Sequence, residues 1–436
     1  MPIPTYDYKS NMFITSASLT DVGIIRDSNE DYMIVDESLN AFIVCDGVGG
    51  HEHGEVASSE AAKFAIQHLQ EHRQIIDRFS DSADAREKID ELLIKAVQGA
   101  GRHIWGLAKD QPDSSRMGTT CTLLLIIKDK GFMAHVGDSR LVMQRKGETH
   151  QLSDDHTYLA EVLQKSELTE EQRKKHPMRN VVTRALGQSE IVMVDTLLFD
   201  VLPDDTFLLC SDGLHQYVYQ AGELLSELSN ENLKDIPQKL IKLANDRGGS
   251  DNITAIIVRA ELQGANVNAQ RERTQQVNLR LMTMKHVDLF RYLSHKEILQ
   301  MQNLAESIEL DAREAVLTEG ETCNALYIIL EGEISIERGG ILITTLSAGS
   351  HFGEMALLSA RPRSATVRTT KPTKIMRITR ARFNDLIRKQ PVLGVKLLWN
   401  FSQVLSIRLE ATTEEFSASA ASYLENAATR RSSLPF

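Results

Sequence analysis

The stretch Ala41-Phe-Ile-Val-Cys-Asp46-Gly47 joins a short apolar run directly to an aspartate and a glycine. Runs this short, rich in β-branched and aromatic residues and bounded by Gly or Asp, predict buried β-strands that end in tight turns. The same arrangement recurs further along the first half of the chain, each time with an aspartate at the end of a predicted strand. These further aspartates are Asp138, Asp212 and Asp251.

Several carboxylates on rigid strand ends can converge on a hard cation. We find no cluster of His and Cys residues with the spacing of metal ligands, so the predicted ligands are all oxygens. Oxygen ligation favours Mg²⁺ or Mn²⁺ over Zn²⁺. The sequence therefore predicts a magnesium or manganese site at the ends of these strands.

Length and charge limit the class of protein. A chain of 436 residues can bury two substantial hydrophobic cores. The formal net charge of -11 argues against nucleic acid as the main partner and against binding to an anionic membrane surface, because both need clustered Lys and Arg. The N-terminal residues lack the blocks of a signal peptide, and no apolar run is long enough to span a bilayer. We expect a cytoplasmic protein.

The four cysteines are scattered, and most lie inside apolar runs. This distribution predicts buried, reduced thiols that contribute to packing, rather than a disulfide framework. The residues are Cys45, Cys121, Cys210 and Cys323.

The strand pattern of the first half ends near Val258, and a polar stretch almost free of large apolar residues follows. That stretch suits a linker or an exposed helix. A second pattern then begins near Met282, with helical spacing followed by short glycine-punctuated strands and a final helix after Pro391. We predict a first domain at 1–260, a linker at 261–281, a second domain at 282–411 and a disordered tail at 412–436.

Residues 54–69 place apolar side chains on one helical face, which predicts a helix packed on a sheet. Helix layers over an antiparallel, strand-rich core form an α+β sandwich. Upstream, Arg26 lies close to Asn29-Glu30-Asp31. A guanidinium group offers a planar fork for phosphate oxygens, and the two acidic residues add to the carboxylates available for metal.

Together these residues resemble the metal-dependent protein phosphatase family (PPM type) in its bacterial form. The resemblance covers roughly Ser16 to Val258. It implies a four-layer α-β-β-α sandwich that acts as a protein-serine/threonine phosphatase. The motifs that carry it are Arg26 with Asn29-Glu30-Asp31, Asp46-Gly47-Val48-Gly49-Gly50, Gly118-Thr119-Thr120, Val136-Gly137-Asp138-Ser139-Arg140, Asp155-His156-Thr157, Thr183-Arg184-Ala185-Leu186-Gly187, Ser211-Asp212-Gly213 and Gly249-Ser250-Asp251-Asn252.

The resemblance implies a pair of Mn²⁺ or Mg²⁺ ions. Asp46 would bridge the two ions, the carbonyl of Gly47 would bind one of them, and Asp212 and Asp251 would complete the pair. Two such ions polarise a bridging water to hydroxide near neutral pH. This hydroxide would attack phosphorus in line. No phosphoenzyme is needed, so no Ser or Cys nucleophile is expected.

Four further residues surround this pair in the resembled family. Glu30 and Asp31 would hold metal-bound waters, and Arg26 would orient the phosphate dianion. Asp138 would bind a third, weaker metal; the alternative is that it caps a turn.

One position departs from the animal members of the family, which have a histidine where this chain has Val48. The leaving-group proton must then come from metal-bound water or another acid, and His51, His53 and His156 are weak candidates for it. The segment Tyr158–Asn180 resembles the mobile flap beside the family's active site.

The second half contains a compact set of residues suited to an anion. Gly353 allows close backbone approach, a short helix after it directs free N–H groups outward, and Arg363 can pair with the anion. Glu354 suits a ribose hydroxyl. The alternative is that Glu354 and Arg363 form an ordinary ion pair in a degenerate domain.

This stretch resembles the phosphate-binding cassette of cyclic nucleotide-binding domains, and the resemblance extends from about Val287 to Leu409. It implies a β-roll with flanking helices, the last helix acting as a lid, that binds cyclic AMP or cyclic GMP. Ser364 does not decide between the two. The implied nucleotide-binding residues are Gly353, Glu354, Met355, Ala356, Arg363, Ser364 and Ala365.

The sequence thus predicts a phosphoserine/phosphothreonine protein phosphatase regulated by a cyclic nucleotide. Its partners would be a phosphoprotein substrate, itself the product of a Ser/Thr kinase, and the nucleotide. The alternative from another class is a cyclic-nucleotide sensor or scaffold in which one of the two domains is inactive. Intact Asp46, Asp212 and Asp251 argue against an inactive phosphatase, and intact Glu354 and Arg363 argue against an inactive sensor.

Overall fold

The computed structural model divides the chain into two compact units, Met1–Gln275 and Gln276–Phe436, which are described separately. No helix among the described residues is long and apolar enough to cross a membrane. The structure describes residues 12–48, 52–109, 117–161, 172, 176–178, 181–218, 224, 227–229, 232–262, 267–322, 324–358 and 362–432.

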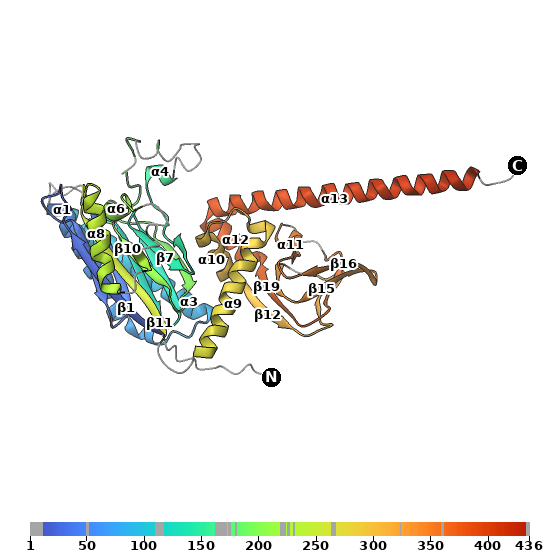
Figure 1. Ribbon diagram of the computed structural model, residues 1–436, viewed down its shortest axis with the longest axis horizontal. Helices are drawn as coiled ribbons and strands as arrows, with labels where there is room; N and C mark the ends of the chain where they lie inside the picture. The colour runs from blue at the N-terminus through green and yellow to red at the C-terminus, as the bar shows by residue number, and fades with distance from the viewer. Residues whose placement is uncertain are drawn as a thin grey trace. The chain divides into compact units, whose positions relative to one another are not determined.

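The first unit contains two antiparallel sheets (Figure 1). One sheet has the order β1 (Met12–Asp21), β11 (Ile253–Leu262), β10 (Thr206–Cys210), β7 (Arg140–Arg145) and β8 (Glu148–Gln151). The other has the order β2 (Asp31–Asp36), β3 (Ala41–Val48), β5 (Cys121–Ile127), β6 (Lys130–Val136) and β9 (Asp195–Asp200), with β4 (Gly118–Thr119) paired to β3.

Strand β3 explains why the sheets stack. Ala41, Ile43 and Cys45 belong to one core cluster, which also includes α1 (Glu52–Glu71) and α3 (Ala83–Lys109). Phe42 and Val44 alternate with them, are equally buried, and point toward the other sheet, whose strands β10 and β11 contact β3. Side chains that alternate in this way, all buried, require a covered sheet on both faces.

The outer face of the first sheet is covered by α8 (Ile236–Asp246) and by the short α6 (Asp212–His215), which share its core cluster. The predicted α+β, four-layer α-β-β-α sandwich is confirmed (Figure 1). The remaining short elements of this unit are α2 (Arg73–Asp77), α4 (Tyr158–Glu161) and η1 (Leu233–Asp235). Three of the four cysteines, Cys45, Cys121 and Cys210, are free and buried, as predicted.

The second unit is the predicted β-roll with flanking helices. Its two four-stranded sheets enclose a core in which the rings of Tyr327 and Phe352 stack at 5.0 Å. The sheets are β12 (Glu306–Leu310), β19 (Thr373–Thr379), β14 (Ala325–Glu331) and β17 (His351–Phe352), and β13 (Ala315–Leu317), β18 (Thr366–Thr369), β15 (Glu333–Arg338) and β16 (Ile341–Ser347). The helices are η2 (Asp288–Phe290), α10 (His295–Leu304), α11 (Met355–Leu358), α12 (Arg380–Lys389) and α13 (Pro391–Ser432).

Residues 412–432 are more regular than the sequence suggested, and the stretch after Leu262 takes one of the two forms that the sequence allowed. Residues 412–432 of the predicted disordered tail continue α13, a single helix of 42 residues (Figure 1). The stretch has neither Gly nor Pro, and its many Ala and Glu residues favour helix even where the surface is polar. Helix α9 (Val267–His286) occupies most of the predicted linker at 261–281, and the division between the units, after Gln275, falls inside it.

Arg273 attaches the first part of α9 to the first unit. Its guanidinium group donates to the carbonyls of Val201 (3.0 Å) and Asp129 (3.1 Å) and to the Asp200 carboxylate (2.9 Å). Its Nε atom also pairs with the Asp129 carboxylate at 2.8 Å. Four contacts to groups that are largely shielded from water make this arginine an anchor for the helix.

We expect Arg273→Ala to loosen the start of α9, because it removes one donor from two carboxylates and two carbonyls, at a cost of about 1–3 kcal/mol. The Asp200 carboxylate keeps Lys130 at 2.6 Å, and the Asp129 carbonyl keeps the amide of Val201 at 2.9 Å. Hydrogen exchange of residues 267–275 should be faster in this variant. Arg271→Ala, which changes an exposed arginine two residues earlier, is the matched control. Equal protection of α9 in the two variants would contradict the anchor.

Candidate metal centre and nucleotide pocket

The predicted metal-binding aspartates come from four different parts of the sandwich. Asp46 lies in β3, directly opposite Asp31 at the start of β2. Asp212 opens α6 after β10, and Asp251 directly precedes the adjacent strand β11. Asp46 and Asp212 come close enough to share a hydrogen bond. The fold therefore brings together carboxylates that are up to 220 residues apart in sequence.

The cluster is electrostatically unfavourable on its own. Burial, followed by repulsion from Asp31, Asp212, Asp138 and Asp251, raises the pKa of Asp46 well above its ordinary value. The pKa of Asp31 is raised to about 7 and that of Asp212 to about 6, in both cases mainly by burial. Without a cation, the site must keep protons to limit this repulsion. Divalent cations would replace those protons.

The sequence left two roles open for Asp138, a ligand for a third metal and the cap of a turn, and its position bears on this choice. Its side chain is buried, and burial followed by repulsion from Asp212 and Asp155 raises the pKa of Asp138 to about 8. The backbone carbonyl of Asp138 accepts a hydrogen bond of 2.9 Å from His215, whose ring is neutral because burial lowers its pKa to about 3. Asp138 therefore lies inside the carboxylate cluster, rather than capping an exposed turn.

Glu30 and Asp31 are held rigidly beside Asp46. The amide of Glu30 donates to Asn252 at 2.8 Å, and its carbonyl accepts from Gly47 at 3.1 Å. Its carboxylate lies where a side chain on Gly54 would be, since a Cβ there would come 2.1 Å from Oε2. Glycine at the start of α1 is thus a condition for this carboxylate to reach the site.

Asp31 is positioned by two hydroxyl groups that the sequence analysis did not single out. Ser211 and Thr254 donate to its Oδ2 atom at 2.7 and 2.6 Å. Ser211 precedes Asp212, and Thr254 lies two residues inside β11. A hydroxyl residue next to a candidate aspartate was the available signal, but Ser and Thr are too common for it to be specific.

Asn252 was also missed as a site residue, although it lies in a quoted motif. Its side-chain amide donates to the carbonyls of Val22 (2.9 Å) and Ser28 (2.8 Å), while its oxygen accepts from Glu30. Asn252 therefore ties the loop 22–30 to the strand that follows Asp251. That loop carries Arg26.

Arg26 lies at the edge of the cluster. Its guanidinium pairs with Asp251 at 2.9 Å, while about half of the side chain remains exposed (47%). An exposed cation beside a carboxylate cluster can receive a phosphate group without first being desolvated. Its placement suits a group that binds and orients a phosphoester at the mouth of the site.

The donors present fit a pair of hard divalent cations. Carboxylates from Asp46, Asp212 and Asp251 supply oxygen atoms of the kind that Mg²⁺ and Mn²⁺ prefer. Burial and neighbouring carboxylates raise the pKa values of Asp46 and Asp212, and bound cations would relieve both effects. Gly47 follows Asp46 in β3, where a side chain would collide with the carbonyl of Gly54 at 2.4 Å. Only glycine can present its carbonyl there.

The candidate acids lie differently from one another. His156 is buried, and both ring nitrogens face partners: Gly137 donates to Nδ1 at 3.1 Å, and Arg184 lies 3.2 Å from Nε2. These contacts give His156 a structural role, so it is not placed to protonate a leaving group. His53 is half-buried at the start of α1. His51, with Gly49 and Gly50, lies outside the described residues, as does most of the predicted flap after α4.

The second unit has a pocket of ≈ 410 Å³ at the predicted cassette, a size that a small ligand can fill. Six of the seven predicted nucleotide-binding residues line it. Ala356 does not line it; its carbonyl accepts a hydrogen bond of 2.6 Å from Arg380. The lining residues are Leu317, Ile336, Thr344, Leu346, His351, Phe352, Gly353, Glu354, Met355, Arg363, Ser364, Ala365, Val367 and Arg408.

Arg363 is held within this pocket by backbone. It donates to the carbonyl of Ala325 at 2.9 Å and to that of Gly353 at 3.4 Å, and its buried Nε atom has no hydrogen-bond partner among the described residues. A side chain on Gly353 would come within 2.9 Å of the guanidinium, so the glycine makes room for it. A donor left unsatisfied in this way is ready for an anion.

Glu354 has a partner that the sequence analysis did not predict. Its buried carboxylate pairs with Arg408 of α13, whose guanidinium also lies 3.2 Å from Nε2 of His351. Arg408 is 54 residues away from Glu354, so only the fold reveals this contact. The predicted lid helix therefore touches the pocket through one cation.

These two sites define a metal-dependent phosphoester hydrolase that carries a second, β-roll domain with a small-ligand pocket. Residues 26–257 match the model of the protein phosphatase 2C family, and residues 307–390 match the model of the cyclic nucleotide-binding domain. The chain belongs to the protein phosphatase 2C family, fused to a cyclic nucleotide-binding domain. The predicted metal-dependent protein-serine/threonine phosphatase is confirmed as the class of enzyme.

Characterised relatives match the first unit. Serine/threonine phosphatase stp of Listeria welshimeri is 34% identical over 246 residues, which is 56% of this chain and 94% of that protein. Protein phosphatase PhpP of Streptococcus pneumoniae is 32% identical over 245 residues, which is 55% of this chain and 95% of that protein.

Solved structures agree with these relatives. The serine/threonine phosphatase PstP/Ppp of Mycobacterium tuberculosis matches with a TM-score of 0.50 at 30% identity, covering 57% of this chain and 99% of that one. The catalytic domain of PstP, solved in complex with two manganese ions, matches with a TM-score of 0.50 at 28% identity, also over 57% and 99%. Metal dependence of this family is thereby seen in a solved neighbour.

The raised pKa of Asp212 predicts how the metal-free chain responds to pH. The folded state keeps a proton that the unfolded state loses between its ordinary pKa of 3.8 and the folded pKa of about 6, so stability falls as the pH rises through this interval. With a chelator at about pH 8, Asp212→Asn should melt at least ~2 °C above the wild type, and the difference should shrink toward pH 4. Mn²⁺ should raise the melting temperature of the wild type by more than it raises that of Asp212→Asn. Equal melting temperatures at pH 8 would contradict the repulsion.

Proposed function

We propose that this enzyme hydrolyses phosphoserine and phosphothreonine in a phosphoprotein, using Mn²⁺ or Mg²⁺, and that a cyclic nucleotide bound to the second unit regulates it. The convergence of Asp31, Asp46, Asp212 and Asp251 at one end of the sandwich carries the first part. The pocket at Glu354 and Arg363 carries the second. A Ser/Thr kinase that produces the substrate belongs to the same proposal.

The protein residues have distinct tasks in the reaction. Divalent cations, when bound, supply a hydroxide nucleophile near neutral pH and neutralise charge on the transferred phosphoryl group. Asp46, at the centre of the cluster, would hold both ions, and Asp212 and Asp251 would each hold one. Arg26 would bind two phosphate oxygens and set the phosphorus in line for attack.

Glu30 and Asp31 act one layer further out. Their carboxylates are fixed by Gly54 on one side and by Ser211 and Thr254 on the other. Such fixed acceptors orient water molecules around a metal, and a pre-organised shell of this kind keeps the reorganisation cost of the reaction low. Neither carboxylate needs to contact the substrate.

Asp251→Asn should lower kcat/KM for a phosphothreonine peptide by on the order of 10³-fold in Mn²⁺, because it removes a metal charge while it preserves shape. Arg26→Ala should lower it by about 10–100-fold, mainly through KM, because the phosphate loses a charged donor. Asp246→Asn, an exposed aspartate on α8, is the control. Activity that survives complete chelation, or equal losses in the two site variants, would overturn these roles.

Regulation follows from the contact between Arg408 and Glu354. A ribose hydroxyl that takes Glu354 as its acceptor must share it with Arg408 or displace it. A cyclic phosphate at Arg363 would at the same time satisfy the unpaired Nε atom of that residue. Nucleotide binding would thus change how α13 is held against the β-roll at Arg408. A helix contact that can be made or released is the kind of change that regulation requires. Whether the ligand is cyclic AMP or cyclic GMP is decided by the titration below.

Arg363→Ala should abolish nucleotide binding and the response of turnover to it, while basal Mn²⁺-dependent activity persists. Arg408→Ala should tighten nucleotide binding, because it removes the competitor for Glu354. The expected response of the wild type is several-fold, equivalent to a coupling of about 1–3 kcal/mol. Titration of both cyclic nucleotides by calorimetry and by phosphopeptide turnover measures this, with Arg368→Ala on the exposed face of β18 as the control.

Two outcomes separate this proposal from its alternative. Tight nucleotide binding with unchanged turnover would refute the regulation and leave a phosphatase that merely carries a sensor. Nucleotide binding without any metal-dependent hydrolysis would support the scaffold in which the first unit is inactive.

A further inference from the structure

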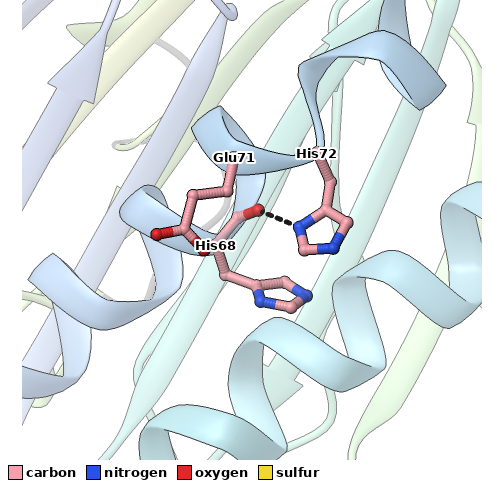
Figure 2. A group of neighbouring side chains, drawn as sticks. All are labelled: His68, Glu71 and His72. Carbon is pink, nitrogen blue, oxygen red and sulfur yellow. Dashed lines mark hydrogen bonds between the residues drawn. The ribbon is translucent and has the colours of Figure 1, made fainter.

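Three side chains with metal-binding atoms gather at the end of α1, on the outer helical layer of the first unit (Figure 2). They are His68, Glu71 and His72, and their ligand atoms lie within 4.8 Å of one another. The spacing i, i+3, i+4 places all three on one face of the helix. The expectation that the chain has no histidine cluster with ligand spacing is therefore wrong.

The ring of His72 is oriented for coordination. Its Nδ1 atom lies 2.9 Å from the backbone carbonyl of His68 and must donate to it (Figure 2). The proton on Nδ1 leaves the lone pair on Nε2 free, which is the tautomer in which metal-bound histidines are usually found. A hydrogen bond of this kind also fixes the direction of the ring.

His68 provides an independent observation. Its Nε2 atom is buried and has no hydrogen-bond partner among the residues that the structure describes. Its ring lies 4.3 Å from that of His72. Burial, followed by electrostatic interaction with the His72 ring, lowers the pKa of His68, which favours the neutral ring that metals bind. A buried polar atom without a partner costs free energy that a metal ligand bond would recover.

Glu71 completes the set from the exposed side. One of its carboxylate oxygens accepts a hydrogen bond of 2.8 Å from Gln67, which leaves the other free to bind. Lys95 on α3 lies close enough to His68 to help lower its pKa, and it is itself paired with Glu91 at 3.1 Å. The cluster therefore has two imidazoles and one carboxylate, with a partly compensated cation nearby.

We propose that His68, Glu71 and His72 form a second metal site, specific for a borderline transition-metal cation such as Zn²⁺. Two nitrogen ligands and one oxygen ligand favour Zn²⁺ over Mg²⁺, which prefers oxygen alone. The three side chains leave a fourth position to water. The simpler alternative, two neighbouring histidine rings tilted by 34°, leaves the buried Nε2 atom of His68 unexplained.

The site is separate from the carboxylate centre. It lies at the other end of α1 from Gly54, and 14 residues of helix between Gly54 and His68 correspond to ~21 Å. His72 lies between α1 and α2 and occupies the N-cap position of α2 without a side-chain capping hydrogen bond. A bound cation would therefore link the last turn of α1 to the chain that enters α2, and would stabilise this corner without entering the reaction.

Cobalt(II) is a suitable probe because its visible absorption reports nitrogen ligation and a low coordination number. The full chain should bind one more equivalent of Co²⁺ than the doubly substituted His68→Gln/His72→Gln chain, and Zn²⁺ should displace it. The double variant should bind this equivalent at least ~10-fold more weakly, while its Mn²⁺-dependent phosphopeptide turnover remains that of the wild type. Asp212→Asn should retain the extra equivalent.

His103→Gln is the matched control, since His103 is a helical histidine on α3 that faces a single carboxylate, Glu60, at 3.4 Å. It should leave the Co²⁺ spectrum unchanged. If the double variant does not fold, Glu71→Gln on the exposed face tests the same spectrum and should shift its bands. Equal numbers of Co²⁺ equivalents and identical spectra in the wild type and in the folded histidine or glutamine variants would overturn the site.

Discussion

Mutual repulsion among carboxylates is the constraint on which the first unit is built. Four buried carboxylates lie close enough to repel their neighbours: those of Asp31, Asp46, Asp138 and Asp212. Burial, and then the charge of neighbouring carboxylates, raises the pKa of each. Such a cluster lowers the stability of the fold unless cations or protons compensate it. Packing within the four-layer sandwich stabilises the fold enough to tolerate this destabilising cluster. Functional sites are commonly less stable than the scaffold that carries them.

The polar residues around the cluster follow from that constraint. Carboxylates that repel one another move apart unless they are held, and here Ser211 and Thr254 donate to the Asp31 carboxylate at 2.7 and 2.6 Å. Asn252 holds the backbone of Glu30, whose amide donates to it at 2.8 Å. Glycine is required where backbones must approach closely: a side chain on Gly213 would collide with the carbonyl of Asn252 at 1.9 Å. The site is thus positioned by contacts between strand ends, not by the aspartates themselves.

The second unit places a partly unpaired positive charge in its pocket, rather than an excess of negative charge. Its pocket offers a cation, Arg363, that is only partly satisfied by backbone carbonyls, and an acid, Glu354, that is neutralised by Arg408 of α13. The first unit gathers excess negative charge that metal ions can neutralise. In the second unit, a phosphate could bind Arg363, and a hydroxyl could compete with Arg408 for Glu354. Helix α9 joins the two units covalently, and Arg273 fixes its first part to the first unit.

The sequence by itself determined the classes of both units, the strand-end aspartates and the anion-binding cassette, because tight turns and close backbone approach demand particular residues next to one another in the chain. It did not reveal Asn252, Arg408 or the His68 and His72 pair, and it mistook the helical residues 412–432 for a disordered tail. Only the tertiary structure decided the contacts of Asn252 and Arg408, since a hydrogen bond between residues 54 or 222 positions apart leaves no local pattern. The four-residue spacing of His68 and His72 and the Ala and Glu residues of 412–432 are local signals that the sequence already carried. Local rules specify backbone geometry, whereas the partners of a polar side chain are chosen by packing over long range.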